Sequence, residues 1–131
     1  MVPLKKILNK LFLSIISFLD KIYFFKAYHY QVINFALNKT SKARHGNINL
    51  LLSTPTKLSK WRAETFSSKE PETLEWIDGF DNNSIFWDIG SNIGLYSVYA
   101  AIKSQCNVCC FEPSFFNLEL LSKNIFLNNV S

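Results

Sequence analysis

Asp88-Ile89-Gly90-Ser91-Asn92-Ile93-Gly94 is the stretch that decides the fold of this 131-residue chain. It begins within the apolar run Ser84–Ile89, which predicts a buried strand, and it leads into Ser91–Lys103, where apolar residues recur at helical spacing. The sequence therefore predicts a strand, a glycine-containing turn and a helix. Glycine at positions 90 and 94 leaves out side-chain atoms that would hold a ligand away from the backbone. The first N–H groups of the helix lack partners within it, so the turn is suited to ligand binding.

A second unit of the same kind follows. Asn107–Phe111 predicts a buried strand in which cysteine serves as a small hydrophobic residue, and Glu112 comes directly after it. Ser114 is suited to cap a helix that runs to about Leu127. The inner face of this helix is expected to carry Phe115, Leu118, Leu121 and Ile125. Strands alternating with helices predict an α/β fold with a parallel sheet, in which ligands bind at the carboxyl ends of the strands.

The residue types at this edge favour a nucleoside cofactor. A carboxylate at Glu112 can accept two hydrogen bonds from the hydroxyls of a ribose. The dinucleotide fingerprint is G-x-G-x-x-G, whereas this turn is D-x-G-x-N-x-G, with Asp88 where a pyrophosphate would require a glycine. A ligand with a cationic sulfonium and an amino-acid tail favours a carboxylate at this position. The chain also lacks the G-K-[ST] motif that binds the phosphates of a nucleoside triphosphate. These residues favour S-adenosylmethionine over NAD or ATP.

Several motifs together resemble the FkbM family of S-adenosylmethionine-dependent methyltransferases over about residues 60–131. They are Arg62-x-Glu64-Thr65-Phe66, Glu70–Ile77 (EPETLEWI), Phe86–Ser97 (FWDIGSNIGLYS), and Phe111-Glu112-Pro113-Ser114 with Asn117. The resemblance implies a Rossmann-like class I methyltransferase sheet of seven strands. It also implies methyl transfer from S-adenosylmethionine to a hydroxyl oxygen of a sugar, glycan or secondary metabolite. The acceptor itself is not specified by the sequence.

The resemblance also implies which residues bind the cofactor. Asp88, Gly90, Ser91, Asn92 and Gly94 would line its methionine side, Glu112 would hold the ribose, and Pro113 and Ser114 would lie beside the adenosine. Glu70 and Thr73 would help to close the site. A general base should deprotonate the acceptor hydroxyl, but no residue of this chain is identified as catalytic. Because Ser131 follows the second βα unit, we expect an incomplete sheet and an amino-terminal portion of such an enzyme.

Three regions are expected along the chain: residues 1–46 as a basic amphipathic helical extension, 47–83 as a lead-in, and 84–131 as the first two βα units. The extension predicts one long or two consecutive helices over 3–38, and a polar, basic break over 38–47 follows. In the lead-in we expect a short strand over Ile48–Ser53, an extended stretch around Trp61–Phe66, and a helix from Pro71 that Gly79 ends. The three tryptophans are expected in a core or an interface.

The charge is divided unevenly along the chain. Residues 1–62 carry nine lysines and two arginines against one acid, a net charge of +10, whereas residues 63–131 carry −6. The basic residues are interpreted as a solvated face, with a second interpretation in which residues 3–26 contact anionic lipid. Two arginines and no basic–aromatic motif do not favour a nucleic-acid partner. No role is assigned to His29 or His45.

The remaining features concern compartment and class. The apolar run Leu11–Leu19 is too short to span a bilayer, which takes ~20 residues, and no small-residue cleavage site follows it. Three cysteines within residues 106–110 build neither a disulfide framework nor a four-ligand metal site, so we expect no metal and a cytoplasmic setting, with peripheral membrane contact as the second interpretation. The competing hypothesis is a catalytically inactive remnant that acts as a membrane-surface or interaction protein. Oligomeric state is left open.

Overall fold

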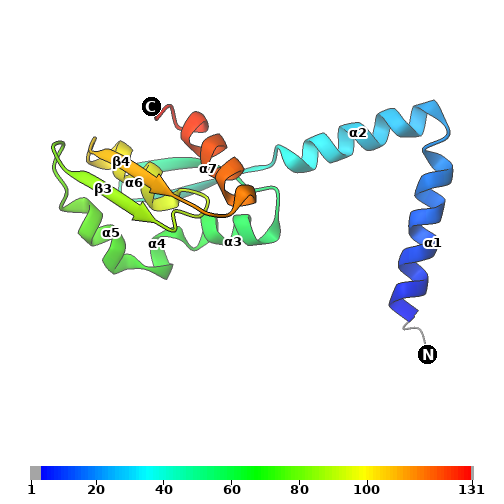
Figure 1. The fold of residues 1–131 in the computed structure, drawn as a ribbon, viewed down its shortest axis with the longest axis horizontal. Helices are drawn as coiled ribbons and strands as arrows, with labels where there is room; N and C mark the ends of the chain where they lie inside the picture. The colour runs from blue at the N-terminus through cyan, green and yellow to red at the C-terminus, as the bar shows by residue number, and fades with distance from the viewer. Residues whose placement is uncertain (1–3, 131) are drawn as a thin grey trace. The chain divides into compact units, whose positions relative to one another are not determined.

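The computed structural model describes residues 4–130, which form a mixed α/β structure. Its contacts divide the chain into two compact units that meet between Leu37 and Asn38. The boundary expected after residue 46 falls instead within a β-hairpin of the second unit. Figure 1 shows the elements of both units in chain order.

The first unit consists of two helices, α1 (Leu4–Leu19) and α2 (Tyr23–Leu37), which confirms the prediction of consecutive helices. His29 Nδ1 lies 2.6 Å from Asp20 Oδ1, and this contact connects α2 to the residues that follow α1. No side chain of α1 is buried. Within residues 4–130 the helices are all too short or too polar to cross a membrane. Residues 1–3 of the predicted extension lie outside the described residues.

The second unit begins with an antiparallel hairpin of β1 (Thr40–His45) and β2 (Ile48–Ser53). The predicted strand over Ile48–Ser53 is confirmed as β2. The polar break expected over 38–47 is wrong, because most of that segment forms strand β1. Only Ala43 of β1 is buried, opposite Leu50, so the strand lacks the apolar pattern that would identify it. Gly46 turns the chain between the two strands with a φ of +54°, a conformation that favours glycine.

Three helices follow: α3 (Lys57–Glu64), α4 (Phe66–Lys69) and α5 (Pro71–Asp78). The extended stretch expected around Trp61–Phe66 is therefore wrong. Helix α3 begins with a capping box in which Thr56 and Ser59 each accept a backbone N–H of the other, and this local bonding favours helix in a polar segment. The helix predicted from Pro71 to Gly79 is confirmed as α5, which has Pro71 in its first turn and ends at Gly79.

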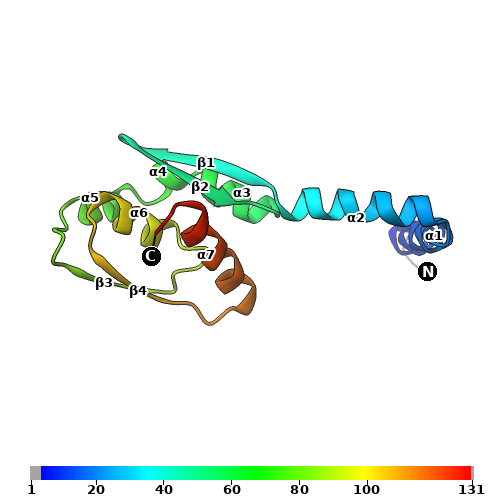
Figure 2. The same ribbon diagram turned by 90° about the horizontal axis from the view of Figure 1, so that it is seen from above.

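The remaining elements are β3 (Ile85–Ile89), α6 (Leu95–Lys103), β4 (Asn107–Phe111) and α7 (Phe115–Leu127), in the expected order, although α6 begins at Leu95 and residues 91–94 belong to the turn. Strands β3 and β4 pair in parallel with Ile85 opposite Asn107 and Ile89 opposite Phe111, and α6 makes the crossover between them. Their carboxyl ends therefore meet at one edge. In Figure 2 the hairpin lies on one side of the second unit and the β3–β4 pair on the other, with α6 between them.

Both strands are less buried than the sequence predicted. Phe86 faces the core, but Trp87 on the opposite face of β3 is 63% exposed, because no described element covers that face. Cys106 is buried as a small hydrophobic residue, whereas Cys109 is exposed, and all three cysteines are free. In α7 only Leu121 of the expected inner face is fully buried, and Phe115 and Leu118 are exposed. The tryptophans are likewise exposed, so none belongs to the core.

The core lies between the hairpin and the parallel strands. It joins Leu50 and Leu52 of β2, Leu74 and Ile77 of α5, and Val98 and Tyr99 of α6. Two asparagines of α7 bind the backbone of β2. Asn124 Oδ1 accepts the N–H of Ser53 at 2.7 Å, while its Nδ2 donates to Ile93 O at 2.7 Å. Asn128 hydrogen-bonds both the N–H and the C=O of Leu51, at 2.9 and 2.8 Å.

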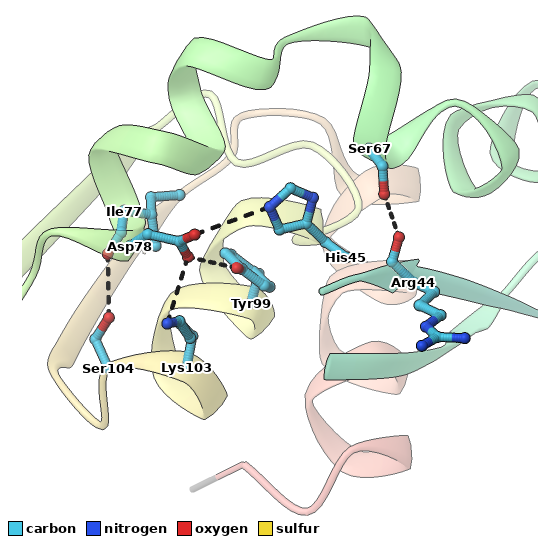
Figure 3. A network of polar contacts seen from close by, with 8 residues as sticks. All are labelled: Arg44, His45, Ser67, Ile77, Asp78, Tyr99, Lys103 and Ser104. Atoms are coloured by element: carbon cyan, nitrogen blue, oxygen red, sulfur yellow. Dashed lines mark hydrogen bonds and ion pairs between the residues drawn. The ribbon is translucent and has the colours of Figure 1, made fainter. Parts of the chain in front are cut away.

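A polar network joins the hairpin to α5 and α6 (Figure 3). The Tyr99 hydroxyl donates to the Asp78 carboxylate, while His45 Nε2 lies 3.9 Å and Lys103 Nζ 3.8 Å from it. Ser104 Oγ donates to Ile77 O at 3.1 Å. Burial, with the contact to Asp78, raises the pKa of Tyr99 well above its ordinary value. His45 thus has a place in the packing between the two sheets.

Candidate functional site

The turn between β3 and α6 is held against the end of β4. Gly90 and Ser91 both donate their backbone N–H groups to Phe111 O, at 2.8 and 3.1 Å. Gly90, Asn92 and Gly94 have φ values of +85°, +54° and +79°, so the backbone turns through the left-handed region at three positions. A Cβ at Gly90 would meet no atom within 4 Å. The turn is therefore open to a ligand at Gly90.

Glu112 lies at the same edge, where the sequence predicts it, and it connects the two turns. Its Oε2 accepts the N–H of Asn92 at 2.7 Å, and its Oε1 accepts the N–H of Ser114 at 2.7 Å and Nδ2 of Asn117 at 3.3 Å. The hydrogen bond from Ser114 is the main reason that the pKa of Glu112 lies below its usual value. A carboxylate offers about four acceptor positions, so Glu112 retains capacity for a further donor.

Asp88 is the second carboxylate of the edge. It is half-buried at the end of β3, where one of its oxygens accepts the hydroxyl of Ser97 in α6. Burial raises the pKa of Asp88, and the hydrogen bond from Ser97 offsets only part of this effect. The ionised form of Asp88 is thus poorly compensated by the protein itself, and a cation beside it would be stabilised.

A cavity of about 450 Å³ opens beside the turn. This volume lies within the range of small-molecule sites, ~300–1,000 Å³. One wall is formed by the end of β3 and the turn, including Asp88, Gly90, Ser91 and Asn92. The other wall comes from helices α3, α4 and α5, through residues that include Arg62, Thr65, Lys69, Glu70 and Thr73. The cavity therefore brings the predicted turn together with the lead-in.

Two polar atoms of residues that line the cavity lack strong partners among the described residues. Asn92 Oδ1 is buried without a hydrogen bond, and Ser91 Oγ has within reach only the Cys110 thiol, a weak hydrogen-bonding group. Buried polar groups in proteins are almost always hydrogen-bonded, because leaving one unpaired costs about 1–3 kcal/mol. Asn92 Oδ1 has almost no exposed surface, so a ligand in the cavity would remove this cost by bonding Oδ1 once the side chain turns toward it.

The cavity lining also includes charged side chains of the helical wall and a phenol, that of Tyr96 at the start of α6. Lys69 Nζ lies 2.9 Å from Glu70 Oε1, and this contact is the main cause of the lowered pKa of Glu70. Burial, with the negative charge of Glu70, raises the pKa of Tyr96 above its ordinary value. Arg62 and Tyr96 were not predicted as site residues. Arg62 lines the cavity from α3, which no local pattern brings to the turn, and Tyr96 lines it from the first turn of α6.

The other residues predicted to bind the cofactor lie outside this cavity. Gly94 is buried, and a Cβ built there would lie 2.2 Å from Leu121 Cδ1, so its glycine permits close packing against α7. Ser114 occupies the N-cap position of α7 without a side-chain hydrogen bond to the helix, and Pro113 is exposed beside it. Glu112 adjoins the cavity through its bond to Asn92.

No protein-family model, no curated protein and no solved structure matches the chain. Among residues 4–130, no three or more His, Cys, Asp or Glu side chains lie together as a metal site would require. The arrangement itself must therefore support any functional proposal.

Proposed function

We propose that the cavity binds S-adenosylmethionine and that the chain supplies the cofactor site of a methyltransferase. Its acceptor would be a hydroxyl group on a sugar, a glycan or a small metabolite. The observation that carries this proposal is the cavity at the carboxyl end of β3, whose lining includes an under-compensated carboxylate, Asp88, and Asn92, a residue with a buried and unpartnered Oδ1. Both features favour a ligand with a positive charge and hydrogen-bond donors.

The residues present are suited to the parts of this cofactor. Asp88 would face its cationic amino-acid portion, Asn92 Oδ1 would accept one of its donors, and open space at Gly90 would admit it against the backbone. The remaining acceptor capacity of Glu112 is suited to ribose hydroxyls. When bound, S-adenosylmethionine supplies a methyl group on a positively charged sulfur.

The chain's own contribution would be binding, orientation and exclusion of water. Helices α3 to α5 form the wall opposite the turn, so a ligand between them would be held away from solvent. Holding a donor methyl and an acceptor oxygen in line is a large part of the rate enhancement in such transfers. The parallel β3–α6–β4 unit is consistent with the first units of a Rossmann-like class I methyltransferase sheet. The free cysteines are consistent with a reducing cytoplasmic setting.

The variant Asp88→Asn tests the proposal, because it should weaken binding without lowering the stability of the fold. Losing the carboxylate should weaken S-adenosylmethionine binding by about 10- to 100-fold, the worth of a hydrogen bond to a charged group. Because burial already disfavours the ionised form at neutral pH, the neutral amide should leave the melting temperature unchanged or raise it. Calorimetric titration and thermal unfolding measure the two effects.

Asp81→Asn is the matched control, since Asp81 lies in an exposed turn away from the cavity. It should leave affinity unchanged. In the wild type, affinity should also fall as the pH is lowered through the raised pKa of Asp88, because protonation removes the same charge. Equal affinity in the wild type and Asp88→Asn would contradict a role for this carboxylate.

A further inference from the structure

Helix α1 carries an apolar face that the described residues leave exposed. Leu4, Leu8, Leu11, Ile15 and Phe18 follow one another at intervals of three or four residues, so they lie on one side of the helix. All five are exposed to solvent, and no α1 side chain is buried. A contiguous apolar surface of this kind in a protein usually marks a contact with a partner or a membrane.

The other side of α1 is basic. Lys6 and Lys10 lie opposite the apolar face and Lys5 lies at its border, while Lys21 and Lys26 follow in the next turns of chain. The single acidic residue among 4–37, Asp20, is already in contact with His29. The unit therefore combines an apolar face with positive charge that no acidic side chain of α1 balances.

Helix α2 adds aromatic residues of the kind that favour membrane interfaces. Phe24 and Tyr28 are exposed on one side of the helix, and the aliphatic Val32, also exposed, continues that side four residues later. Tyrosine has an apolar ring and a polar hydroxyl, which suits it to the boundary between lipid chains and water.

We infer that α1 binds the surface of a bilayer rich in anionic lipid, in the plane of the membrane, with its apolar face among the lipid chains. Length excludes a span, since no described helix can cross a bilayer. The lysines disfavour pairing of α1 with α1 of a second copy, because like charges would be brought together without acidic partners. An anionic membrane satisfies both the apolar face and the charge. The inference does not depend on the proposed cofactor site.

Flotation of the whole chain with lipid vesicles tests this inference. Vesicles of phosphatidylcholine with about one third phosphatidylserine should carry the protein upward, and vesicles of phosphatidylcholine alone should carry much less, because each lysine near an anionic surface strengthens binding several-fold. Replacing Lys5, Lys6 and Lys10 by glutamine should weaken binding to the anionic vesicles by about 100-fold. Molar salt should weaken the wild type in the same direction, because it screens charge over ~3 Å.

Two leucines in α1 allow the contribution of apolar insertion into the bilayer to be measured separately from that of charge. Leu11 lies at the centre of the apolar face, whereas Leu13 lies on the basic side, and the two are similarly exposed at 57% and 65%. Leu11→Ser should weaken vesicle binding by about tenfold or more, and Leu13→Ser should change it little. Because both side chains are exposed, both variants should keep the wild-type melting temperature.

Three results would overturn the inference. The first is failure of the wild type to float with anionic vesicles. The second is an equal loss of binding in Leu11→Ser and Leu13→Ser. The third is a dimer in light scattering that Leu11→Ser dissociates in the absence of vesicle binding, which would assign the apolar face to a second copy. If all variants bind S-adenosylmethionine as the wild type does, the cofactor site functions independently of the lipid-binding face of α1.

Discussion

Asn124→Leu is expected to lower the free energy of unfolding by at least about 2 kcal/mol. Asn124 has no exposed surface, and its side chain is bonded to Ser53 N in β2 and to Ile93 O in the turn before α6. Leucine has a similar size but bonds neither group, and each buried backbone group left unpaired costs about 1–3 kcal/mol. Since native domains are stable by only ~5–15 kcal/mol, the loss should be clear in urea-induced unfolding.

Asn128→Leu is the matched control for this prediction. Asn128 lies one turn later in the chain and bonds the backbone of Leu51 in the same strand, but it is only partly buried. Water can replace its hydrogen bonds, so the loss of stability should be distinctly smaller than for Asn124→Leu. If Asn124→Leu and Asn128→Leu lower the free energy of unfolding equally, the burial of Asn124 does not add to the stabilising effect of its hydrogen bonds.

Gly94→Ala is the second substitution with a large expected effect, a loss of about 2–5 kcal/mol. The φ of +79° at Gly94 costs a residue with a side chain about 1–2 kcal/mol. The added Cβ would also lie 2.2 Å from Leu121 Cδ1, and forcing a buried side chain aside typically costs about 1–3 kcal/mol. Unfolding in urea, followed by circular dichroism, measures the sum.

Gly90→Ala separates the two contributions, because it lies in the same turn with a φ of +85° but meets no atom within 4 Å. It should show only the conformational cost, about 1–2 kcal/mol. The difference between the two alanine variants then measures the packing of the turn against α7. A Gly94→Ala loss no larger than that of Gly90→Ala would show that Leu121 moves aside freely.

The sequence was sufficient to predict the elements after residue 70 because each has a strong local signal. Pro71 and Gly79 bound α5, and the change from continuous apolar runs to helical spacing defines β3, α6, β4 and α7. The first strand and α3 were missed for the opposite reason. Strand β1 buries one residue, Ala43, and its pairing with β2 holds it in place, whereas α3 is polar and depends on the bonds between Thr56 and Ser59.

The candidate site was predictable only where it follows the chain. Asp88, Gly90 and Asn92 lie in the cavity wall because the turn itself forms that wall. Arg62 and Thr65 reach the same cavity through the packing of α3 and α4, which no local pattern indicates. At Gly94 the sequence-based prediction was misleading. The spacing of the glycines predicted a ligand contact there, whereas in the structure Gly94 lies against Leu121. A glycine motif alone does not distinguish close approach of a ligand from close approach of a side chain.

Calorimetric titration of the chain with S-adenosylmethionine, NAD and ATP in parallel tests the central claim most directly. We predict saturable binding of S-adenosylmethionine with one site per chain, and no measurable binding of NAD or ATP, because Asp88 would repel their phosphates. Binding of NAD or ATP in place of S-adenosylmethionine, or binding of none of the three, would contradict the assignment of this cavity.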